Sequence, residues 1–386
     1  MEKRKILFLD HTPFIGGAQL SLISHLEKIN KNEFKILVGC STKAKELGLV
    51  EEYSKLNIGY FFISFGHLKV FNLLAFFRLV KSVREVRRVI KKEKIDLIFG
   101  NTVRADIVGS LATLFSRTKI VWFIQDYTFP KTLFNFLKFI PEKIFYVSHS
   151  VAHYYRVKEN EKHRVIYIWR NFHEKVAIVP REAISKKREN WGAGKDTVII
   201  GYVGRLVEWK GPQILIEAVE ILLKEGFKNI KCIIIGSGKG QEESNEEEVK
   251  NLVNNKNLTN DVVFTGFESN IPLSILSLDI LCLPSIEAEP FSSVVVEAMM
   301  AKIPVIGTNI GGTPEIIKDE QTGLLIPPKD KQALSLAIKR LIVNKELRSR
   351  IINKAYNYAI NNHTSKYITT KLQKEYLLIL KDKKYR

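Results

Sequence analysis

Two series of short apolar patterns, each alternating with helical patterns, constrain the fold of this 386-residue chain more than any other feature. The first series reads as the strands KILFLD, FKILVGC, GYFFIS, DLIFGN, KIVWFIQD and KIFYVS. The second series reads as the strands TVIIGYVG, KCIIIGS, DVVFTG, DILCLPS, IPVIGT and GLLIPP. Alternation of strands and helices is typical of parallel sheets that are covered on both faces. The sequence therefore predicts an α/β protein with two Rossmann-like domains, whose ligands bind at the carboxyl ends of the strands.

A mixed, charged segment, residues 165–196, separates the two series. We expect an N-terminal domain over residues 1–178 and a C-terminal domain over residues 179–363. Residues 331–361 have a helical pattern, which the polar sequence NNHT interrupts. Residues 364–386 predict one further amphipathic helix that ends in a basic tail.

The sequence argues against several classes of protein. No apolar run reaches the roughly 18–20 residues of a membrane span. The apolar stretch after the basic N-terminus is too short for a signal peptide. Cys40, Cys232 and Cys282 lie far apart without metal-ligand spacing, which argues against a zinc site and a disulfide framework. We expect reduced, buried thiols in a cytoplasmic protein.

Two glutamates flank a Pro-Phe-Ser-Ser turn in EAEPFSSVVVEAMMA, residues 287–301. The turn joins a predicted strand to a predicted helix, where Ser292 or Ser293 is a suitable N-cap. Backbone N–H groups and the helix dipole make such a helix start an anion site. Ionised carboxylates accept hydrogen bonds from hydroxyl groups, so Glu289 and Glu297 fit two polyols that flank a diphosphate. A nucleotide sugar has this layout, and the alternative is an ordinary loop acid beside a helical Glu that pairs with a neighbour.

Arg205 and Lys210 lie in GYVGRLVEWKGPQILIEAV, on a loop before a helix that begins near Pro212. Two cations on one loop match the charge of a diphosphate, and Arg binds phosphate oxygens in a bidentate manner. Neither IIIGSGKG nor HTPFIGGAQLSL is a G-x-G-x-x-G fingerprint, which disfavours a dinucleotide oxidoreductase. The sequence has no Asp-x-Asp pair to hold Mg²⁺. We therefore predict no metal and no cofactor, with protein cations neutralising the diphosphate.

Over nearly its whole length, the chain resembles a GT-B glycosyltransferase of the retaining family 4 type. The resemblance rests on the Gly16-Gly17 loop, the Arg205/Lys210 loop, the Glu289-x7-Glu297 pair and the later sequence GGTPE, residues 311–315. It implies the GT-B fold, in which two Rossmann-like domains face a cleft and the C-terminal helix, here 364–386, crosses back to complete the N-terminal domain. It also implies a hexosyltransferase that uses a nucleotide-diphosphate sugar, such as a UDP- or GDP-sugar, in glycan biosynthesis.

The resemblance also implies roles for individual residues. In the family, the Arg and the Lys bind the donor diphosphate, the first Glu contacts the donor sugar, and the second Glu binds the nucleotide ribose. These roles fall on Arg205, Lys210, Glu289 and Glu297, of which the first three are the predicted catalytic residues. The further implied donor contacts are Gly16 and Gly17 for the diphosphate, Gly266 for the base, and Phe291, Ser292, Ser293 and Val294 for sugar and phosphate.

One position departs from the family pattern. Many members have His-Asp after the strand that corresponds to KIVWFI, whereas this chain has Gln125-Asp126. The family His contacts the donor sugar, and Gln125 can form hydrogen bonds there but cannot titrate. The implied mechanism tolerates this change. It is a front-face substitution in which the departing phosphate oxygen takes the proton of a glycan or lipid-linked acceptor.

Two other functions stay open. A nucleotide-sugar epimerase shares the two-domain layout but needs acid–base side chains around the hexose, which the loss of the His disfavours. A non-catalytic subunit that binds nucleotide sugars or docks on membranes is compatible with Gln125. Nucleic acid is not an expected partner, because the sequence contains no recognised module with base-stacking aromatics.

Positive charge is concentrated in the N-terminal half. The net charge is +19 for the chain, with +16 in residues 1–190 and +3 in residues 191–386. The basic half is expected to face an acidic partner.

Residues 67–94 predict a helix with an apolar face for sheet packing and a basic face opposite. The apolar face is Phe76, Leu79, Val80, Val83, Val86 and Ile90, and the basic face is Arg78, Lys81, Arg84, Arg88 and Lys92. Phe71, Leu74 and Phe77 lie on or beside the basic face, and residues 129–143 also mix Phe with Lys. This pattern predicts peripheral association with an anionic membrane surface, at the inner face of the cell membrane. The alternative is a solvated basic face.

Overall fold

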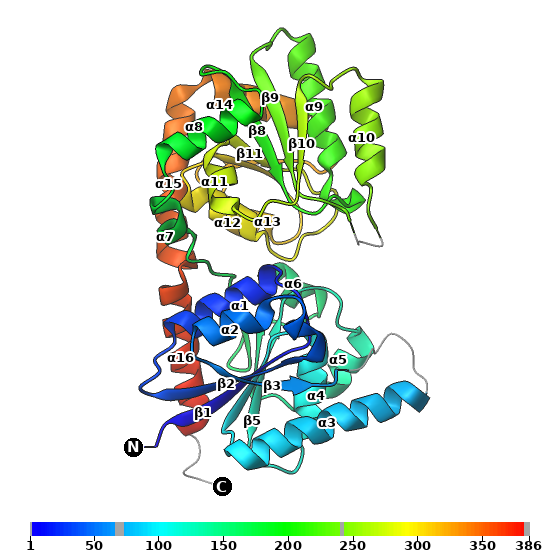
Figure 1. Cartoon of the computed structure of the whole chain (residues 1–386), viewed down its shortest axis with the longest axis vertical. Helices are drawn as coiled ribbons and strands as arrows, with labels where there is room; N and C mark the ends of the chain where they lie inside the picture. Colours follow the sequence, from blue (N-terminus) through cyan, green and yellow to red (C-terminus); the bar gives the residue numbers. More distant parts are fainter. Residues whose placement is uncertain (1, 66–72, 240–242, 382–386) are drawn as a thin grey trace. The chain divides into compact units, whose positions relative to one another are not determined.

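The computed structural model describes residues 2–65, 73–239 and 243–381. The chain forms two compact units (Figure 1). Unit 1 contains Met1–Trp169 and Ser365–Arg386, and unit 2 contains Arg170–Thr364. The predicted second domain starts at residue 179. Unit 2 begins earlier because helix α7 (Phe172–Ala177) packs against α11 (Ile271–Leu276) and α12 (Ser293–Met300).

Unit 1 is built on a parallel seven-stranded sheet in the order β3-β2-β1-β4-β5-β6-β7. Its strands are β1 (Arg4–Asp10), β2 (Phe34–Ser41), β3 (Gly59–Ile63), β4 (Leu97–Gly100), β5 (Lys119–Ile124), β6 (Lys143–Tyr146) and β7 (His163–Val165). Strand order reverses between β1 and β4, which pair in parallel with Leu9 opposite Gly100. Asp10 ends β1 and Asn101 follows β4, so both lie at the switch point where α/β sheets place ligands.

Helices connect these strands because each parallel crossover needs a long return path. They are α1 (Gly17–Lys28), the 3-10 turn η1 (Thr42–Lys45), α2 (Leu49–Lys55), α3 (Leu73–Glu93), α4 (Val103–Thr113), α5 (Lys131–Leu137) and α6 (His149–Tyr154). The central strand β1 is fully buried over Ile6–Leu9, as expected for a sheet covered on both faces.

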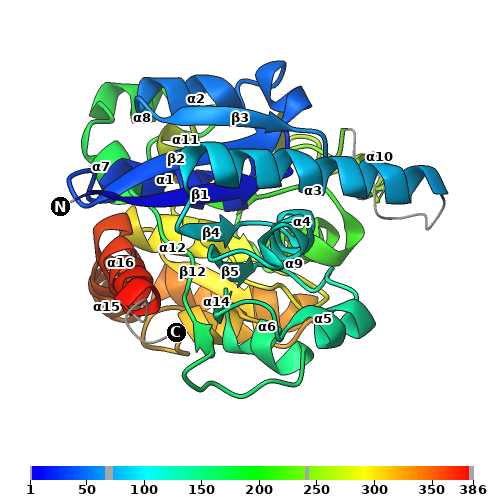
Figure 2. The same ribbon diagram turned by 90° about the horizontal axis from the view of Figure 1, so that it is seen from below.

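The last helix, α16 (Ser365–Lys381), completes unit 1 by packing beside α1 (Figures 1 and 2). Its Thr369 Oγ1 lies 2.9 Å from His25 Nδ1, and its Tyr376 hydroxyl lies 3.1 Å from His25 Nε2. Burial lowers the pKa of His25 to about 3, so the imidazole is neutral in the folded protein. The prediction that the C-terminal helix crosses back to the first domain is confirmed.

Unit 2 repeats the architecture with a parallel six-stranded sheet in the order β10-β9-β8-β11-β12-β13. Its strands are β8 (Val198–Val203), β9 (Ile230–Ile235), β10 (Val262–Gly266), β11 (Ile280–Leu283), β12 (Val305–Thr308) and β13 (Leu324–Ile326). Besides α7, α11 and α12, its helices are α8 (Arg181–Asn190), the 3-10 turn η2 (Glu208–Lys210), α9 (Pro212–Lys224), α10 (Glu246–Asn255), α13 (Thr313–Ile316), α14 (Lys331–Val343) and α15 (Lys345–His363). The predicted α/β class with two Rossmann-like units is confirmed.

Every strand of the two predicted series is present, and the differences lie in short or interrupted elements. Strand β7 was not predicted, because only one of its three residues is apolar and none of them is buried. The helix predicted over 331–361 is two helices, since Asn344 caps α15 by accepting a hydrogen bond from the N–H of Leu347. The predicted interruption after residue 361 falls at Thr364, which is extended between α15 and α16. The N–H of Arg170 donates to the carbonyl of His363, so the two ends of unit 2 pair.

Candidate active site

The loop after β8 carries the two predicted diphosphate ligands, Arg205 and Lys210. It passes through η2 and ends at Gly211, whose φ of +69° lies in the left-handed region. A Cβ at this position would lie 2.1 Å from the carbonyl oxygen of Pro284, so the approach requires glycine. The glycine thereby holds the loop after β8 against the loop after β11.

Lys210 and Glu289 form an ion pair within this loop cluster. Lys210 Nζ lies 2.6 Å from Glu289 Oε1, and Ser285 Oγ donates to Glu289 Oε2 at 2.9 Å. The two charged side chains are only 12% and 7% exposed. Removing either partner would leave a charge with little water around it, which is costly in a protein interior. The structure therefore brings together two of the three predicted catalytic residues.

The predicted GGTPE motif supports Glu289 through its backbone. Gly311 has a φ of +63°, and a Cβ there would lie 2.6 Å from the backbone nitrogen of Glu289. The N–H of Gly312 donates to the carbonyl of Glu289 at 2.7 Å. The motif thus positions the acidic loop from the adjacent β12–α13 connection.

The indole ring of Trp209 lies near both cations of the β8 loop, Arg205 and Lys210. Lys210 Nζ lies 4.8 Å from the centre of its indole ring, and Arg205 Cζ lies 5.8 Å from it. Both distances suit cation–π attraction. The backbone beneath is also fixed, because the buried Tyr202 hydroxyl donates to the carbonyl of Arg205 at 2.6 Å. The Arg205 side chain itself is exposed.

Glu297 lies on α12 and pairs with a residue that the sequence analysis did not identify. Arg170 Nε lies 2.8 Å from Glu297 Oε1, and both side chains are nearly buried. Burial raises the pKa of Glu297 above its usual value, and the charge of Arg170, its hydrogen bond and the nearby Lys175 partly oppose this rise. The two cations thus stabilise the ionised form of Glu297, whereas burial destabilises it.

The start of α12 places the other predicted donor contacts in one backbone segment. Ser292 is the N-cap, as predicted, but its side chain accepts no hydrogen bond from the first turn in the described part of the chain. Phe291 and Ser292 are buried, while Ser293 and Val294 are half-buried. The anion-binding capacity of this helix start therefore rests on backbone N–H groups and the dipole.

Three glycines at the ends of neighbouring strands connect Gly266 to the β8 loop. Gly266 ends β10 with a φ of +69°, and its carbonyl accepts from the N–H of Gly236 at 2.9 Å. A Cβ on Gly236 would lie 1.8 Å from the carbonyl oxygen of Gly204, directly before Arg205. Gly266 therefore lies near the predicted diphosphate ligands, at the carboxyl edge of the sheet.

The remaining predicted residues belong to unit 1. Gly16 is the N-cap of α1, and Gly17 is its first residue. Gln125 follows β5, and its Nε2 donates to both the backbone oxygen and the side-chain oxygen of Asn101, each at 2.9 Å. These residues lie at the carboxyl edge of the unit 1 sheet, where ligands are expected.

Two partners of the predicted acids, Arg170 and Ser285, are not predicted from the sequence. Arg170 comes from a segment that was interpreted as a linker, 127 positions before Glu297. Ser285 follows a predicted strand, but a lone serine carries no signal. Only the fold shows that these side chains reach the predicted acids.

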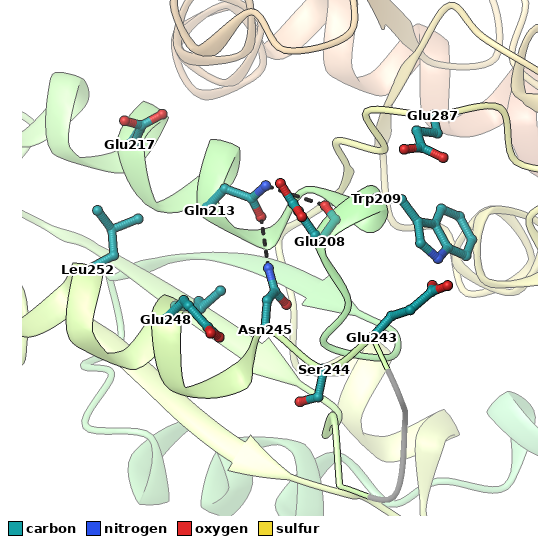
Figure 3. A pocket seen from close by; sticks show the side chains of 11 residues that line it. Glu208, Trp209, Gln213, Glu217, Glu243, Ser244, Asn245, Glu248, Leu252 and Glu287 are labelled. Atoms are coloured by element: carbon teal, nitrogen blue, oxygen red, sulfur yellow. Dashed lines mark hydrogen bonds between the residues drawn. The ribbon is translucent and has the colours of Figure 1, made fainter.

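Trp209 also lines a cavity of about 780 Å³ that has a different character (Figure 3). Five glutamates surround it: Glu208, Glu217, Glu243, Glu248 and Glu287. Gln213 bridges its wall by donating to the carbonyl of Glu208 at 3.3 Å and accepting from Asn245 at 3.4 Å. Carboxylates at this density disfavour a diphosphate inside the cavity.

The basic helix of unit 1 exposes aromatic side chains. Helix α3 buries Ser82, Val86, Val89 and Ile90, and its predicted basic residues are exposed. Phe76 was predicted to pack on the sheet, but it is 59% exposed because it lies in the first turn, which extends away from the sheet (Figures 1 and 2). Leu74 and Phe77 are exposed as predicted, and Phe71 lies outside the described residues.

Two absences hold for the described residues, 2–65, 73–239 and 243–381. None of their helices is long and apolar enough to cross a membrane. None of their His, Cys, Asp and Glu side chains form a group of three or more placed to hold a metal ion.

The chain is similar to known proteins over both units. The family model described as glycosyl transferases group 1 matches residues 183–358. The capsular polysaccharide biosynthesis glycosyltransferase CapM of Staphylococcus aureus is 25% identical over 328 residues, which are 80% of this chain and 83% of that protein. The UDP-Gal:alpha-D-GlcNAc-diphosphoundecaprenol alpha-1,3-galactosyltransferase of Escherichia coli is 22% identical over 373 residues, covering 91% of this chain and 93% of that protein.

A solved structure shares the fold. The crystal structure of Anabaena Alr3699/HepE in complex with UDP and glucose aligns with a TM-score of 0.82 at 24% identity. The alignment covers 97% of this chain and 99% of that chain. This likeness extends the fold assignment to the whole molecule.

Proposed function

We propose that this chain, a glycosyltransferase with the GT-B fold whose residues 183–358 form a glycosyl transferases group 1 domain, moves a sugar from a nucleotide-diphosphate sugar to a glycan or lipid-linked acceptor. The transfer retains the configuration of the anomeric carbon. The observation that carries the proposal is the contact of Glu289 with Lys210 and Ser285. The contact brings together Glu289, which can accept hydrogen bonds from sugar hydroxyls, and Lys210, which can neutralise a diphosphate.

Donor binding is an exchange of partners at this contact. Before the donor binds, Lys210 neutralises Glu289. A diphosphate carries more negative charge than a carboxylate, so it competes for Lys210 and also attracts the exposed Arg205. The ionised Glu289 then accepts hydrogen bonds from hydroxyl groups of the sugar, while Ser285 keeps it oriented. The same residues thus serve the free and the occupied site.

Glu297 binds the ribose in this proposal. Its pairing with Arg170 holds the carboxylate in place despite burial. An ionised carboxylate has about four lone-pair directions, so the hydrogen bond to Arg170 leaves room for ribose hydroxyls to donate as well. A hydroxyl donor also lowers the cost of burying the charge.

The chemistry is a front-face substitution. The bond from the anomeric carbon to the diphosphate oxygen breaks, and the acceptor oxygen forms a new bond on the same face. The acceptor proton passes to the departing phosphate oxygen. Arg205 and Lys210 neutralise the leaving diphosphate, so no divalent metal is needed. Gln125 contacts the donor sugar through hydrogen bonds and takes no part in proton transfer.

We also propose that unit 1 docks on an anionic membrane surface at the inner face of the cell membrane. The first turns of α3 expose Leu73, Leu74, Phe76 and Phe77 at 58–72%, and exposed basic residues follow on the same helix. Helix α5 and the residues after it add Phe136 and Phe139, which are 79% and 76% exposed. Aromatic side chains insert at the headgroup boundary, and each cation near the surface adds about 1 kcal/mol. Docking would bring the enzyme to lipid-linked acceptors.

A donor panel tests the proposed reaction. The protein is incubated with UDP-, GDP- and ADP-sugars and glycan or polyprenyl-linked acceptors, and the products are separated by mass. UDP-sugars come first because the Escherichia coli relative is named for UDP-Gal. We expect release of the nucleoside diphosphate together with an α-linked product from an α-linked donor, in the presence of EDTA. An epimerised sugar, or binding without turnover by every donor, would contradict the proposal.

Vesicle co-sedimentation tests the docking. We expect recovery with anionic vesicles that falls when Phe76 and Phe77 are both changed to Ser. Leu336→Ser is the matched control, because Leu336 is 58% exposed on unit 2. Equal recovery with neutral and anionic vesicles, or an equal loss in the control, would end this proposal.

A further inference from the structure

We infer that Asp10, a residue with no predicted role, is a positioning residue that orients two parts of the donor site of unit 1, the Gly16-Gly17 turn and Gln125. Asp10 ends β1 and is fully buried. The inference rests on the proposed function, because the roles of the glycine turn and Gln125 belong to that proposal. The hydrogen bonds themselves are independent of it.

One arm of the network runs from Asp10 to the glycine turn. Gln19 Nε2 donates to Asp10 Oδ2 at 2.9 Å and lies 3.3 Å from Oδ1. Gln19 Oε1 in turn accepts from the backbone N–H of Gly16 at 3.2 Å. The buried amide of Gln19 therefore links Asp10 to the N-cap of α1.

The other arm runs from Asp10 to Gln125. Asn101 Nδ2 donates to Asp10 Oδ2 at 2.7 Å. Asn101 Oδ1 accepts from Gln125 Nε2 at 2.9 Å, and the Asn101 backbone oxygen accepts from the same nitrogen. Asn101 is 2% exposed, so this arm is also protected from water. The switch point of the sheet thus joins β1, β4 and β5 by side-chain hydrogen bonds.

The carboxylate sets the direction of both arms. It only accepts hydrogen bonds, so the amides of Gln19 and Asn101 must turn their NH₂ groups toward it. Their oxygens then face outward, toward the Gly16 N–H and Gln125 Nε2. Gln125 consequently keeps its Oε1 for another donor, and that atom is buried without a hydrogen-bond partner within the described chain. A hydroxyl of the donor sugar would satisfy it.

An amide at position 10 would reverse this order. The backbone N–H of Thr12 donates to Asp10 Oδ1 at 2.8 Å and cannot turn around, so it would keep the amide oxygen on its side. The new NH₂ group would then face Asn101 Nδ2 and Gln19 Nε2, which are donors. Both side chains would have to flip or lose a bond, and a flipped Asn101 would present NH₂ to Gln125.

Asp10→Asn is the first test, because it preserves size and removes only the acceptor. We expect kcat to fall on the order of ten- to hundred-fold, since small misplacements at a reacting centre cost this much. The affinity for free UDP, which the unit 2 residues would dominate, should change less than threefold. Equal kcat in the variant and the wild type would overturn the inference.

The double variant Asp10→Asn/Asn101→Asp is the sharper test. It moves the carboxylate one link along the network, so that the amide at position 10 donates to it and Gln125 still donates to an acceptor. It restores the arm to Gln125 and leaves the donor mismatch at Gln19, so we expect it to recover part of the lost kcat. Asn101→Asp alone sets two carboxylates against each other, so we expect its kcat to stay below that of the wild type. Failure of the double variant to recover kcat, with a melting temperature equal to that of Asp10→Asn, would show a merely structural role.

A second measurement does not need activity. In protein labelled with ¹⁵N-glutamine, the side-chain NH₂ signal of Gln125, identified through Gln125→Ala, should exchange slowly with water. We expect Asp10→Asn to shift this signal and to speed its exchange at least tenfold, and the double variant to restore it. An unchanged signal in Asp10→Asn would overturn the network. If no donor is turned over by the wild type, the proposed function fails, and this measurement still decides the inference.

Discussion

The two units hold their buried acids in different ways. In unit 2, Glu289 and Glu297 each lie against a cation, Lys210 and Arg170. In unit 1, Asp10 accepts hydrogen bonds from neutral amides, as described above. A neighbouring cation therefore balances each of these acids of unit 2, whereas Asp10 of unit 1 has amide partners whose direction it sets.

Asp106 of α4 shows the contrast most sharply. It is fully buried, and its two oxygens accept no hydrogen bond from the described residues. Burial, followed by the neighbouring Asp126 and Asp10, raises the pKa of Asp106 well above its usual value of 3.8. The comparison teaches that cations compensate the acids of unit 2, whereas the uncompensated burial of Asp106 makes stability depend on pH.

The largest expected effect comes from breaking a pair in unit 2. Lys210→Met leaves Glu289 buried without its cation, so we expect the free energy of unfolding to fall by about 3–5 kcal/mol. Urea unfolding measures this change. Donor turnover should also be lost.

The matched control is Lys210→Met/Glu289→Gln, in which both charges are removed. It should regain most of the stability and none of the activity. If the single and double variants are equally stable, the two charges are not coupled and the contrast between the units fails.

Removing an unpaired acid in unit 1 should have the opposite sign. Because the pKa of Asp106 is higher in the folded than in the unfolded protein, the folded state loses stability as pH rises above about 4. Asp106→Asn should therefore be more stable than the wild type at pH 8 by about 1–3 kcal/mol, and the gain should shrink toward pH 4. The exposed Asp196→Asn is the control, with no expected gain. A pH-independent difference would contradict the assignment.

His25 should make the acid side of the stability curve steep. Its pKa is about 3 in the folded protein and 6.5 ordinarily, so the unfolded chain takes up the proton first. Stability is thus complete above pH 6.5 and declines as pH falls toward 3, by up to about 1.4 kcal/mol per pH unit. His25→Gln should remove this slope in urea unfolding between pH 4.5 and 7. An unchanged slope would show that groups other than His25 cause the loss of stability at low pH.

The smallest expected effect is on donor affinity at Glu297. An alanine would remove the acceptor of the Arg170 hydrogen bond, so glutamine is the informative change because it keeps the shape and a hydrogen-bond acceptor. A neutral acceptor binds ribose hydroxyls more weakly than a carboxylate, by about 1 kcal/mol, which corresponds to five- to tenfold in Kd for UDP. Calorimetric titration measures it. An unchanged Kd for UDP would show that Glu297 does not bind the ribose.

The sequence predicted the parts of the molecule that local patterns encode. Strand runs such as KIVWFI and loop motifs such as EAEPFSS carry periodicity and turn chemistry within a few residues. The structure has a strand over KIVWFI and starts a helix at Ser293, as expected. The Lys210–Glu289 contact could be anticipated as a shared site but not as an ion pair. Arg170 and Asn101 could not be anticipated, because each reaches its partner across many residues of intervening chain. Long-range pairing is a property of the fold and leaves no mark in the sequence around either residue.

The return of α16 to unit 1 has a consequence for biosynthesis. Unit 2 is uninterrupted in sequence, whereas unit 1 needs residues from both ends of the chain. Helix α16 leaves the ribosome only after the whole of unit 2, so the surface of α1 around His25 stays uncovered until α16 has been synthesised. Unit 2 can therefore fold on the ribosome before unit 1 is complete. Nascent chains that stop before α16 should expose the apolar surface of α1, to which chaperones bind.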